Sequence, residues 1–356
     1  MSNIAVLTSG GDSPGMNAAV MSVARSANRL DMPLIGIKRG YNGLLGRSGK
    51  LEDDFVRLDL DTVLDIADLP GTYLRTARCN EFMDPAVRER AAQRLRDMDV
   101  TGLVVIGGNG SFQGAMRLCE LGIPCIGIPG TIDNDLAYTE MTLGYDTAVN
   151  CCSDVVRAIR ATSRSHDRPH VVEVMGRDCG DIALSTAAAT GAEIVVVPEV
   201  KWSVDEVADK LNFQIKRGNT RATVVIAEGC WASMKPFDVY KFLSPYGKEV
   251  YEGEPMSANR LASVLKRKCG MIEVRSTVVG YTQRGADPTA RDCIFAFEAG
   301  AMAVELLKKG ISNQVIGMKN GKTFYMPIEK ALAAKHTFNK KLYDTVNVFH
   351  PSHKRR

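Results

Sequence analysis

The segment Pro124-Cys125-Ile126-Gly127-Ile128-Pro129-Gly130-Thr131-Ile132-Asp133-Asn134-Asp135 joins a short apolar run to a polar turn. The apolar run is bounded by turn residues, which is typical of a strand buried on both faces of a parallel sheet. A hydroxyl and two carboxylates then follow where that strand should end. Ligands bind at the carboxyl ends of strands in open α/β sheets, so we expect a ligand site at this turn.

The two carboxylates of this turn suit phosphoryl transfer to an alcohol. One carboxylate can hold a metal ion while the other accepts the proton of the hydroxyl. A purely structural alternative is an Asx-turn, in which Asp133 and Asp135 only hold backbone amides. The turn by itself leaves both interpretations open.

Two further loops favour the functional interpretation. Gly10-Gly11-Asp12-Ser13-Pro14-Gly15 follows the apolar residues 4–7, and Gly107-Gly108-Asn109-Gly110-Ser111 follows the apolar residues 103–106. Small residues let backbone N–H groups approach an anion, and a following helix N-terminus favours negative charge. Neither loop matches the Walker A or Gly-x-Gly-x-x-Gly pattern, and a plain tight turn is the alternative for each.

Strand-like and helical segments alternate along the chain, which predicts parallel βαβ units and the α/β fold class. At 356 residues the chain is long for one core, so we expect two lobes. The expected strands are 4–7, 34–37, 103–106, 124–128, 171–174, 193–197, 223–227 and 276–279. The expected helices are 16–30, 84–98, 112–121, 147–164, 204–217 and 293–309. Residues 232–259 break this rhythm and are interpreted as a surface insertion.

The composition is that of an ordinary globular protein, with 45% hydrophobic and 24% charged residues. The net charge of +4 gives no nucleic-acid footprint, and no apolar run approaches membrane-spanning length. The nine cysteines show no zinc-type spacing and no disulfide framework, which favours reduced thiols. The N-terminus also lacks the features of a signal peptide. We therefore expect a cytoplasmic protein with no nucleic-acid or membrane partner.

Five ordered motifs resemble the bacterial-type 6-phosphofructokinases. They are Gly10–Asn17, Gly107–Ser111, Pro129–Asp135, Val174-Met175-Gly176-Arg177 and Gln283-Arg284-Gly285. The resemblance implies two Rossmann-like three-layer α/β/α lobes with mostly parallel sheets. Residues 1–144 and about 283–335 would form the larger nucleotide and magnesium lobe, residues 145–282 the sugar-phosphate lobe, and residues 336–356 a C-terminal tail.

The activity implied by the resemblance is a glycolytic one. The γ-phosphoryl group of ATP would pass to the 1-hydroxyl of fructose 6-phosphate, giving fructose 1,6-bisphosphate and ADP, with Mg²⁺ as cofactor. By the same resemblance, Asp133 would be the general base, and Thr131 and the Gly11 N–H would place the phosphoryl group. Arg177 would stabilise its spreading charge, and Asp135 and Asn109 would hold the metal.

The remaining implied contacts divide into three sets. The nucleotide-side residues are Gly11, Tyr41, Arg78, Cys79, Gly108, Asn109, Gly110, Ser111 and Gly114. The sugar-side residues are Thr131, Asp133, Arg168, Met175, Gly176, Arg177, Glu228, Arg275, Tyr281 and Arg284. Arg168, Arg275 and Arg284 would grip the 6-phosphate, and the first two reach in from a neighbouring subunit, which implies a homotetramer. The allosteric effector set is Arg25, Arg160, Glu193 and Arg217.

Several positions depart from the family pattern. Asn109 replaces an aspartate that assists the metal, so we expect weaker or shifted Mg²⁺ binding. Tyr281 replaces a histidine, and Cys79 stands where an aromatic often flanks adenine. Met21 and Asn219 replace two basic effector residues, so we expect a weak or altered response to nucleotide or phosphoenolpyruvate effectors.

Donor choice depends on two glycines. Gly110 and Gly130 stand where pyrophosphate-using relatives typically carry a carboxylate and a lysine, which favours ATP. A pyrophosphate-dependent or broader sugar-phosphate phosphotransferase is the alternative. A non-catalytic sensor weakened in metal affinity by Asn109 is a third hypothesis, against which the retained Thr131, Asp133, Asp135 and Arg177 argue.

Overall fold

A seven-stranded sheet and a four-stranded sheet form the centres of two compact units. The computed structural model describes residues 3–243 and 254–348. Unit 1 contains the described residues up to Ala148 together with Arg284–Thr337. Unit 2 contains Val149–Gln283 and the described residues from Phe338 onward.

The sheet of unit 1 has the strand order β11-β10-β5-β4-β1-β2-β3. The five inner strands run parallel, while β3 and β11 are antiparallel to their neighbours at the two edges. The strands are β1 (Asn3–Thr8), β2 (Leu34–Ile37), β3 (Phe55–Leu58), β4 (Val100–Gly107), β5 (Cys125–Pro129), β10 (Gln314–Lys319) and β11 (Lys322–Pro327).

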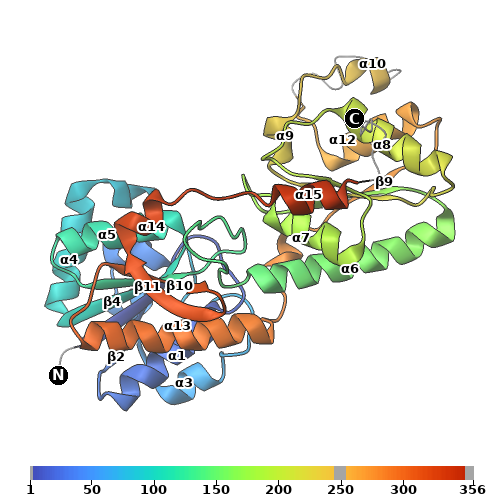
Figure 1. The fold of residues 1–356 in the computed structure, drawn as a ribbon. Helices are drawn as coiled ribbons and strands as arrows, with labels where there is room; N and C mark the ends of the chain where they lie inside the picture. The colour runs from blue at the N-terminus through green and yellow to red at the C-terminus, as the bar shows by residue number, and fades with distance from the viewer. Residues whose placement is uncertain (1–2, 244–253, 349–356) are drawn as a thin grey trace. The chain divides into compact units, whose positions relative to one another are not determined.

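Helices cover both faces of this sheet (Figure 1). Alternate residues of β1 point to opposite faces, so Ile4 and Val6 enter one hydrophobic core while Ala5 and Leu7 enter the other. The first core takes residues from α1 (Met16–Arg29), α3 (Leu60–Leu64) and α13 (Ala290–Lys308). The second takes residues from α4 (Pro85–Asp97), α5 (Asn109–Glu120) and α14 (Ile328–Ala333). The short segments η1 (Gly40–Leu45), α2 (Leu51–Asp54) and η2 (Asn80–Met83) complete the unit.

Asp292, a buried residue near the start of α13, holds the segment that leads out of the Thr131–Asp135 turn. Its carboxylate accepts hydrogen bonds from the Gly144 N–H at 2.8 Å, the Thr147 N–H at 2.9 Å and the Thr147 hydroxyl at 2.5 Å. The Thr147 hydroxyl also accepts the N–H of Thr289, which caps α13. One carboxylate therefore joins two segments separated by more than a hundred residues.

Replacing Asp292 by alanine should destabilise the protein by about 3 kcal/mol or more, because three buried donors lose their acceptor. Urea unfolding of Asp292→Ala against the parent measures this loss. The exposed Asp287, on the loop before α13, provides Asp287→Ala as a control that should leave the unfolding midpoint unchanged. Equal stability of all three proteins would contradict the role given to Asp292.

The sheet of unit 2 is parallel throughout, with the order β7-β8-β6-β9. The strands are β6 (His170–Val174), β7 (Ile194–Val196), β8 (Thr223–Ala227) and β9 (Arg275–Val278). The helical segments are α6 (Tyr145–His166), whose first residues belong to unit 1, α7 (Asp181–Thr190), α8 (Val204–Lys216), α9 (Cys230–Ser233), α10 (Tyr240–Leu243), α12 (Ala258–Lys268), η3 (Gly280–Gln283) and α15 (Lys340–Val346).

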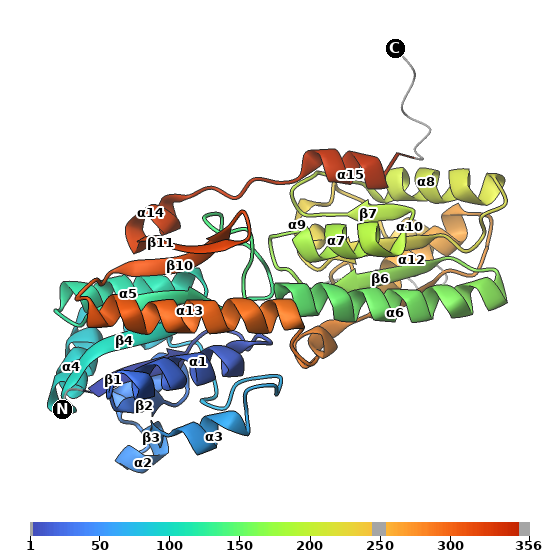
Figure 2. The ribbon, with the colours of Figure 1, turned by 60° about the horizontal axis from the view of Figure 1, so that its bottom comes forward.

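Helices pack directly on this second sheet (Figure 2). Helix α12 contacts β6 and β9. Helix α7 contacts β7 and β8 and also packs against α15. The side chain of Asn347, just after α15, accepts the Val195 N–H at 3.2 Å and donates to the Val195 carbonyl at 3.1 Å. Residues 338–348, expected as part of a tail, therefore lie in unit 2 against β7.

The structure confirms the predicted α/β class with mostly parallel sheets. All eight predicted strands are present, but β3, β10 and β11 were not predicted. Of the predicted insertion at 232–259, the described part contains α10 and the start of α12, and residues 244–253 lie outside the described residues. Among the described residues, no helix is both long and apolar enough to span a membrane. The nine cysteines, all of them among the described residues, form no disulfide bond.

Candidate active site

Three polar loops meet at one edge of the sheet in unit 1. They follow β1, β4 and β5, which are adjacent and parallel, so their carboxyl ends share that edge. Backbone hydrogen bonds connect the three segments directly where the strands end. The Ser9 N–H donates to the Ile106 carbonyl at 2.9 Å, and the Gly130 N–H donates to the Gly107 carbonyl at 3.0 Å.

The loops after β1 and β4 pack too closely for a side chain at Gly107. A Cβ atom there would lie 2.5 Å from the Ser111 hydroxyl and 2.6 Å from the Ser9 carbonyl oxygen. The Ser111 hydroxyl donates to that same carbonyl at 3.3 Å. Ser111 therefore helps fix one glycine loop against the other, which accounts for a small residue at both positions.

The turn Thr131–Asp135 is held by hydroxyl groups. The Thr131 hydroxyl accepts the Asp133 N–H at 3.2 Å, and the Thr142 hydroxyl donates to the Thr131 carbonyl at 2.6 Å. Asn134 takes a left-handed backbone conformation, with φ of 55°, which turns the chain between the two aspartates. Asp133 is buried and Asp135 is half-buried. Both carboxylates therefore belong to the same turn at the sheet edge.

Arg284 lies on the glycine loop that follows β1. Its guanidinium donates to the Asp12 carbonyl at 2.8 Å, and a Cβ atom on Gly11 would lie 2.9 Å from the same nitrogen. The Thr76 hydroxyl donates to the neighbouring Gly10 carbonyl at 3.0 Å. Within unit 1, a guanidinium thus stands beside the predicted phosphate-binding loop.

Tyr41 forms an inner wall beside the β4 loop. Its ring is buried and stacks on Phe82, with centroids 4.2 Å apart, and its hydroxyl donates to the Ser111 carbonyl at 2.5 Å. A Cβ atom on Gly114 would lie 2.8 Å from the ring. Burial raises the pKa of Tyr41 well above its usual value. The sequence analysis did not predict that Phe82 belongs to this site. The only indication in the sequence is a single aromatic residue shortly after Arg78 and Cys79.

The two glycines used to infer the donor differ in their surroundings. A Cβ atom on the exposed Gly110 would meet no atom within 4 Å, so packing does not require glycine there. At Gly130 a Cβ atom would lie 2.9 Å from Met16 and 3.0 Å from Ile106. Packing alone accounts for Gly130, so Gly110 carries more of the inference about the donor.

The oxygen donors at this edge suit Mg²⁺. Asp135 offers a half-buried carboxylate, and Asn109, at the exposed first turn of α5, offers an amide oxygen. Magnesium prefers oxygen ligands and keeps several waters, so a site open to solvent on one side fits the ion.

Unit 2 brings a second group of predicted residues to the carboxyl edge of its own sheet. Met175-Gly176-Arg177 follows β6, and Glu228 follows the neighbouring strand β8. The Arg177 N–H donates to the Glu228 carboxylate at 3.0 Å, and the Glu228 N–H donates to the Val174 carbonyl at 2.9 Å. Gly176 has a φ of 139°, and a Cβ atom there would lie 2.4 Å from the Cys179 carbonyl, so only glycine fits.

Arg168 and Arg275 lie at the opposite edge of the same sheet. Arg168 precedes β6, and Arg275 begins β9 opposite His170. Both guanidinium groups pair with the carboxylate of Glu273, that of Arg168 at 3.0 Å. Five residues of β6 separate this edge from Met175, a distance of roughly 16 Å at 3.3 Å per residue. Tyr281, in η3 beyond the carboxyl end of β9, is mostly exposed.

His170 is neutral in the folded protein over most of the acid range. Burial, aided by Arg168 and Arg275, lowers its pKa to about 4, and its Nε2 lies 2.8 Å from the Thr277 hydroxyl. The unfolded chain protonates His170 near pH 6.5, the ordinary value. Between these two values the unfolded state binds the extra proton, so stability falls as the pH is lowered.

The stability of the parent should therefore decrease between about pH 6.5 and pH 4, with His170 contributing about 3 kcal/mol at most. Replacing His170 by glutamine should flatten this part of the curve, as measured by urea unfolding across the pH range. His166, an exposed histidine at the end of α6, supplies His166→Gln as the control. An identical pH dependence in parent and His170→Gln would overturn the assignment.

Part of the predicted effector set is brought together in unit 2. Arg160 binds the Glu193 carboxylate through two nitrogens at 3.0 and 3.2 Å. The Asn219 amide donates to the same carboxylate at 3.1 Å, and the Thr223 N–H does so at 2.8 Å. Arg217 lies over the ring of Phe213 instead, and Arg25 of unit 1 lies over Phe297. The Glu193 carboxylate therefore already has three protein partners, and one of them is the Asn219 amide.

Comparison with known proteins identifies the family. The sequence matches the family described as "Phosphofructokinase" over residues 3–307. The chain belongs to the phosphofructokinase family. It is 44% identical to an ATP-dependent 6-phosphofructokinase of Clostridium botulinum (strain Hall) over 98% of this chain and 99% of the relative. It is 43% identical to the ATP-dependent 6-phosphofructokinase of Clostridium acetobutylicum over the same shares of both chains.

A solved phosphofructokinase structure from Saccharomyces cerevisiae has the same fold. It superimposes with a TM-score of 0.81 at 29% sequence identity and covers 97% of this chain. This chain spans half the length of the yeast chain. The yeast structure therefore supports the phosphofructokinase fold over nearly the whole of this protein.

Proposed function

We propose that this chain is an ATP-dependent 6-phosphofructokinase, which transfers the γ-phosphoryl group of ATP to the 1-hydroxyl of fructose 6-phosphate. The observation that carries this proposal is the meeting of the Thr131–Asp135 turn with the two glycine loops at one sheet edge. Its curated relatives, 43% and 44% identical over 98% of this chain, are named for the ATP-dependent reaction. A pyrophosphate-dependent activity is not favoured.

Asp133 would act as the general base on the sugar hydroxyl. Its burial in a turn made rigid by the Thr131 and Thr142 hydroxyls would orient the carboxylate before the substrate arrives. Thr131 and the N–H of Gly11 would position the phosphoryl group, and Arg177 would neutralise the charge that spreads over its oxygens. Asp135 and Asn109 would hold Mg²⁺, which supplies charge neutralisation on the phosphates when bound.

Replacing Asp133 by asparagine should lower kcat by about 10²–10⁴-fold, because the amide cannot accept the proton of the hydroxyl. The measurement is steady-state turnover with fructose 6-phosphate and Mg²⁺, with ATP and pyrophosphate compared side by side. Asp61→Asn, in the short helix α3, serves as a matched control that should retain full turnover. Turnover of Asp133→Asn equal to that of the parent would exclude this role, and faster turnover with pyrophosphate would exclude ATP as the donor.

We further propose that unit 1 is the nucleotide and magnesium lobe, and that unit 2 is the sugar-phosphate lobe. Arg168 and Arg275 lie at the edge of the unit 2 sheet opposite Arg177 and Glu228, so one sheet edge cannot present all four to one substrate. A neighbouring copy that supplies the two arginines would complete the site. This geometry supports the homotetramer, whose presence sedimentation would test.

Glu273 competes for the 6-phosphate in this scheme. It is the carboxylate that both arginines hold, and the hydrogen bond from Arg168 lowers its pKa. Replacing Glu273 by glutamine removes a negative charge that substrate would have to displace. The KM for fructose 6-phosphate should fall by about two- to fivefold with kcat unchanged, because the phosphate would no longer have to displace a carboxylate from the two guanidinium groups.

Steady-state kinetics of Glu273→Gln measure this change in KM. The control is Glu298→Gln, a substitution on α13 of unit 1 that should leave KM unchanged. A higher KM for Glu273→Gln than for the parent would show that Glu273 orients the arginines rather than competing with the phosphate.

We also propose a cytoplasmic enzyme with a weak effector response. The nine described cysteines form no disulfide bond, which supports a reducing compartment. The effector proposal rests on Glu193, which Arg160, Asn219 and Thr223 already engage, and on the amide that stands at position 219 in place of a cation.

A further inference from the structure

Two cysteines of unit 1 lie at the junction between α5 and β5. Cys119 is the second-last residue of α5, and Cys125 is the first residue of β5, at the amino end of that strand. The three polar loops of the candidate active site lie at the opposite, carboxyl edge of the same sheet. Cys125 is fully buried, and Cys119 packs half-buried against the same hydrophobic core. Neither thiol therefore has a task in the proposed phosphoryl transfer.

A tight turn joins the end of α5 to the start of β5. The Ile123 N–H donates to the Leu118 carbonyl at 3.0 Å, and the Gly122 N–H donates to the Cys119 carbonyl at 3.0 Å. Gly122 has a φ of 82°, the left-handed conformation that commonly ends a helix. The Cys125 thiol donates to the Ile123 carbonyl at 3.3 Å. The turn therefore fixes the backbone that carries both thiols.

The sulfur of Cys119 is surrounded by hydrogen-bond donors. Hydrogen bonds from the Cys125 thiol and from the N–H groups of Cys125 and Asn313 reach this sulfur and lower the pKa of Cys119. The Asn313 N–H also donates to the Cys125 carbonyl at 2.8 Å, so this donor is fixed to β5. Burial, together with the neighbouring Cys119, raises the pKa of Cys125 well above its usual value. The surroundings therefore favour a thiolate at Cys119 and keep the proton on Cys125.

Cys119 differs in this respect from the other accessible thiols of the chain. Four of the nine cysteines are half-buried, and the other five are buried. The half-buried ones are Cys79, Cys119, Cys151 and Cys293. Burial raises the pKa of Cys79, of Cys151 and of Cys293. Because the thiolate is the form that attacks an electrophile, Cys119 is the most nucleophilic of the four.

We propose that Cys119 and Cys125 form a peroxide-reactive dithiol, which closes to a disulfide when the protein is oxidised and reopens when it is reduced. Cys119 is the attacking thiol, and Cys125 is the resolving thiol beside it. The oxidant is a peroxide, for which hydrogen peroxide is the probe. The proposal concerns a modification site and does not depend on the proposed activity.

The oxidation proceeds in two steps. First, the Cys119 thiolate attacks one peroxide oxygen, so an S–O bond forms, the O–O bond breaks, and the other oxygen leaves as hydroxide, which takes up a proton to give water. Second, the Cys125 sulfur attacks the sulfenic acid on Cys119, so an S–S bond forms, the S–O bond breaks, and the oxygen leaves as water with the proton of Cys125. One peroxide is thus reduced to two waters while two thiols are oxidised.

The buried partner has a protective effect on the reactive thiol. A sulfenic acid without a neighbouring thiol can be oxidised further to sulfinic acid, which is irreversible for most proteins. The disulfide stops this reaction, and thiol–disulfide exchange with a reductant restores both thiols. Such a transient disulfide is compatible with a reducing compartment.

The test is peptide mapping of the reduced full-length protein after exposure to hydrogen peroxide, with the remaining free thiols blocked by N-ethylmaleimide. Trypsin releases residues 118–157 as one peptide, and cleavage after glutamate separates fragment 118–120 from fragment 121–140. The first fragment contains Cys119 and the second contains Cys125. Mass spectrometry should find the two fragments linked after peroxide and separate after dithiothreitol.

Three variants assign the roles of the two thiols. Cys119→Ser and Cys125→Ala should each abolish the linked fragments, and urea unfolding shows that each variant is folded. In Cys125→Ala the sulfenic acid stays on Cys119, where dimedone captures it. Cys119 should carry about tenfold more dimedone than Cys151, since each unit of pKa changes the thiolate fraction about tenfold. The matched control Cys151→Ser removes a half-buried thiol of α6 and should form the linked fragments as the parent does.

Dimedone present during oxidation of the parent gives the same comparison of Cys119 with Cys151 without any substitution. Equal label on these two thiols would overturn the proposal, because Cys119 would then have no special reactivity. The proposal would also fail if the parent showed no linked fragments at peroxide concentrations that oxidise its other thiols. Linked fragments found only in covalent dimers on a non-reducing gel would contradict a disulfide within one chain.

Discussion

The parallel pairing of β5, β4 and β1 is the constraint on which the proposed chemistry depends. Parallel strands end at a common edge, and the hydrogen bonds from Ser9 to Ile106 and from Gly130 to Gly107 extend the pairing into the loops. The glycine loop after β1, the glycine loop after β4 and the turn with two carboxylates therefore meet through their backbones, without long side chains. Close backbone approach at Gly107 makes that meeting tight.

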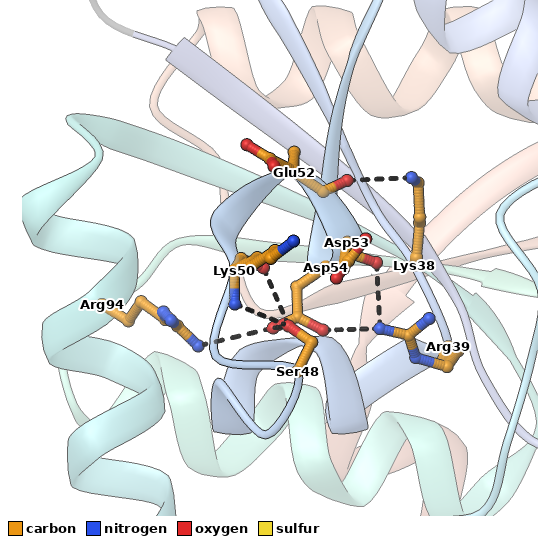
Figure 3. Close-up of polar contacts among 8 residues, drawn as sticks. All are labelled: Lys38, Arg39, Ser48, Lys50, Glu52, Asp53, Asp54 and Arg94. Atoms are coloured by element: carbon orange, nitrogen blue, oxygen red, sulfur yellow. Dashed lines mark hydrogen bonds and ion pairs between the residues drawn. The ribbon is translucent and has the colours of Figure 1, made fainter.

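Carboxylates hold loops in place in both units, with Asp292 and Asp54 buried and Glu193 half-buried. Asp292 joins the start of α6 to α13, Asp54 holds the segment before β3 (Figure 3), and Glu193 gathers Arg160 and Asn219 in unit 2. Each of them accepts several hydrogen bonds, which is what makes a buried charge tolerable. Loops that carry binding groups are thus positioned by polar contacts, while the apolar cores position the strands beneath them.

Unit 2 places two groups of predicted site residues at opposite edges of one sheet. Arg177 and Glu228 lie at the carboxyl edge, where a Rossmann-like unit normally binds its ligand, whereas Arg168 and Arg275 lie at the amino edge with Glu273 between them. Because the strands are rigid, these groups cannot approach one another within the unit. In the proposed assembly of several copies, the amino-edge arginines would reach a substrate that they cannot reach within one copy.

The sequence by itself determined the α/β class, the eight principal strands and the three loops with their turn residues, because period, glycine spacing and turn chemistry are local. It also carried the family resemblance, which comparison with known proteins confirmed. Only the tertiary structure decided that Phe82 covers Tyr41, that Arg284 lies on Gly11, and that Glu273 holds Arg168 and Arg275. These pairs join segments up to about 270 residues apart, and their contacts depend on strand order and packing, which no local pattern contains.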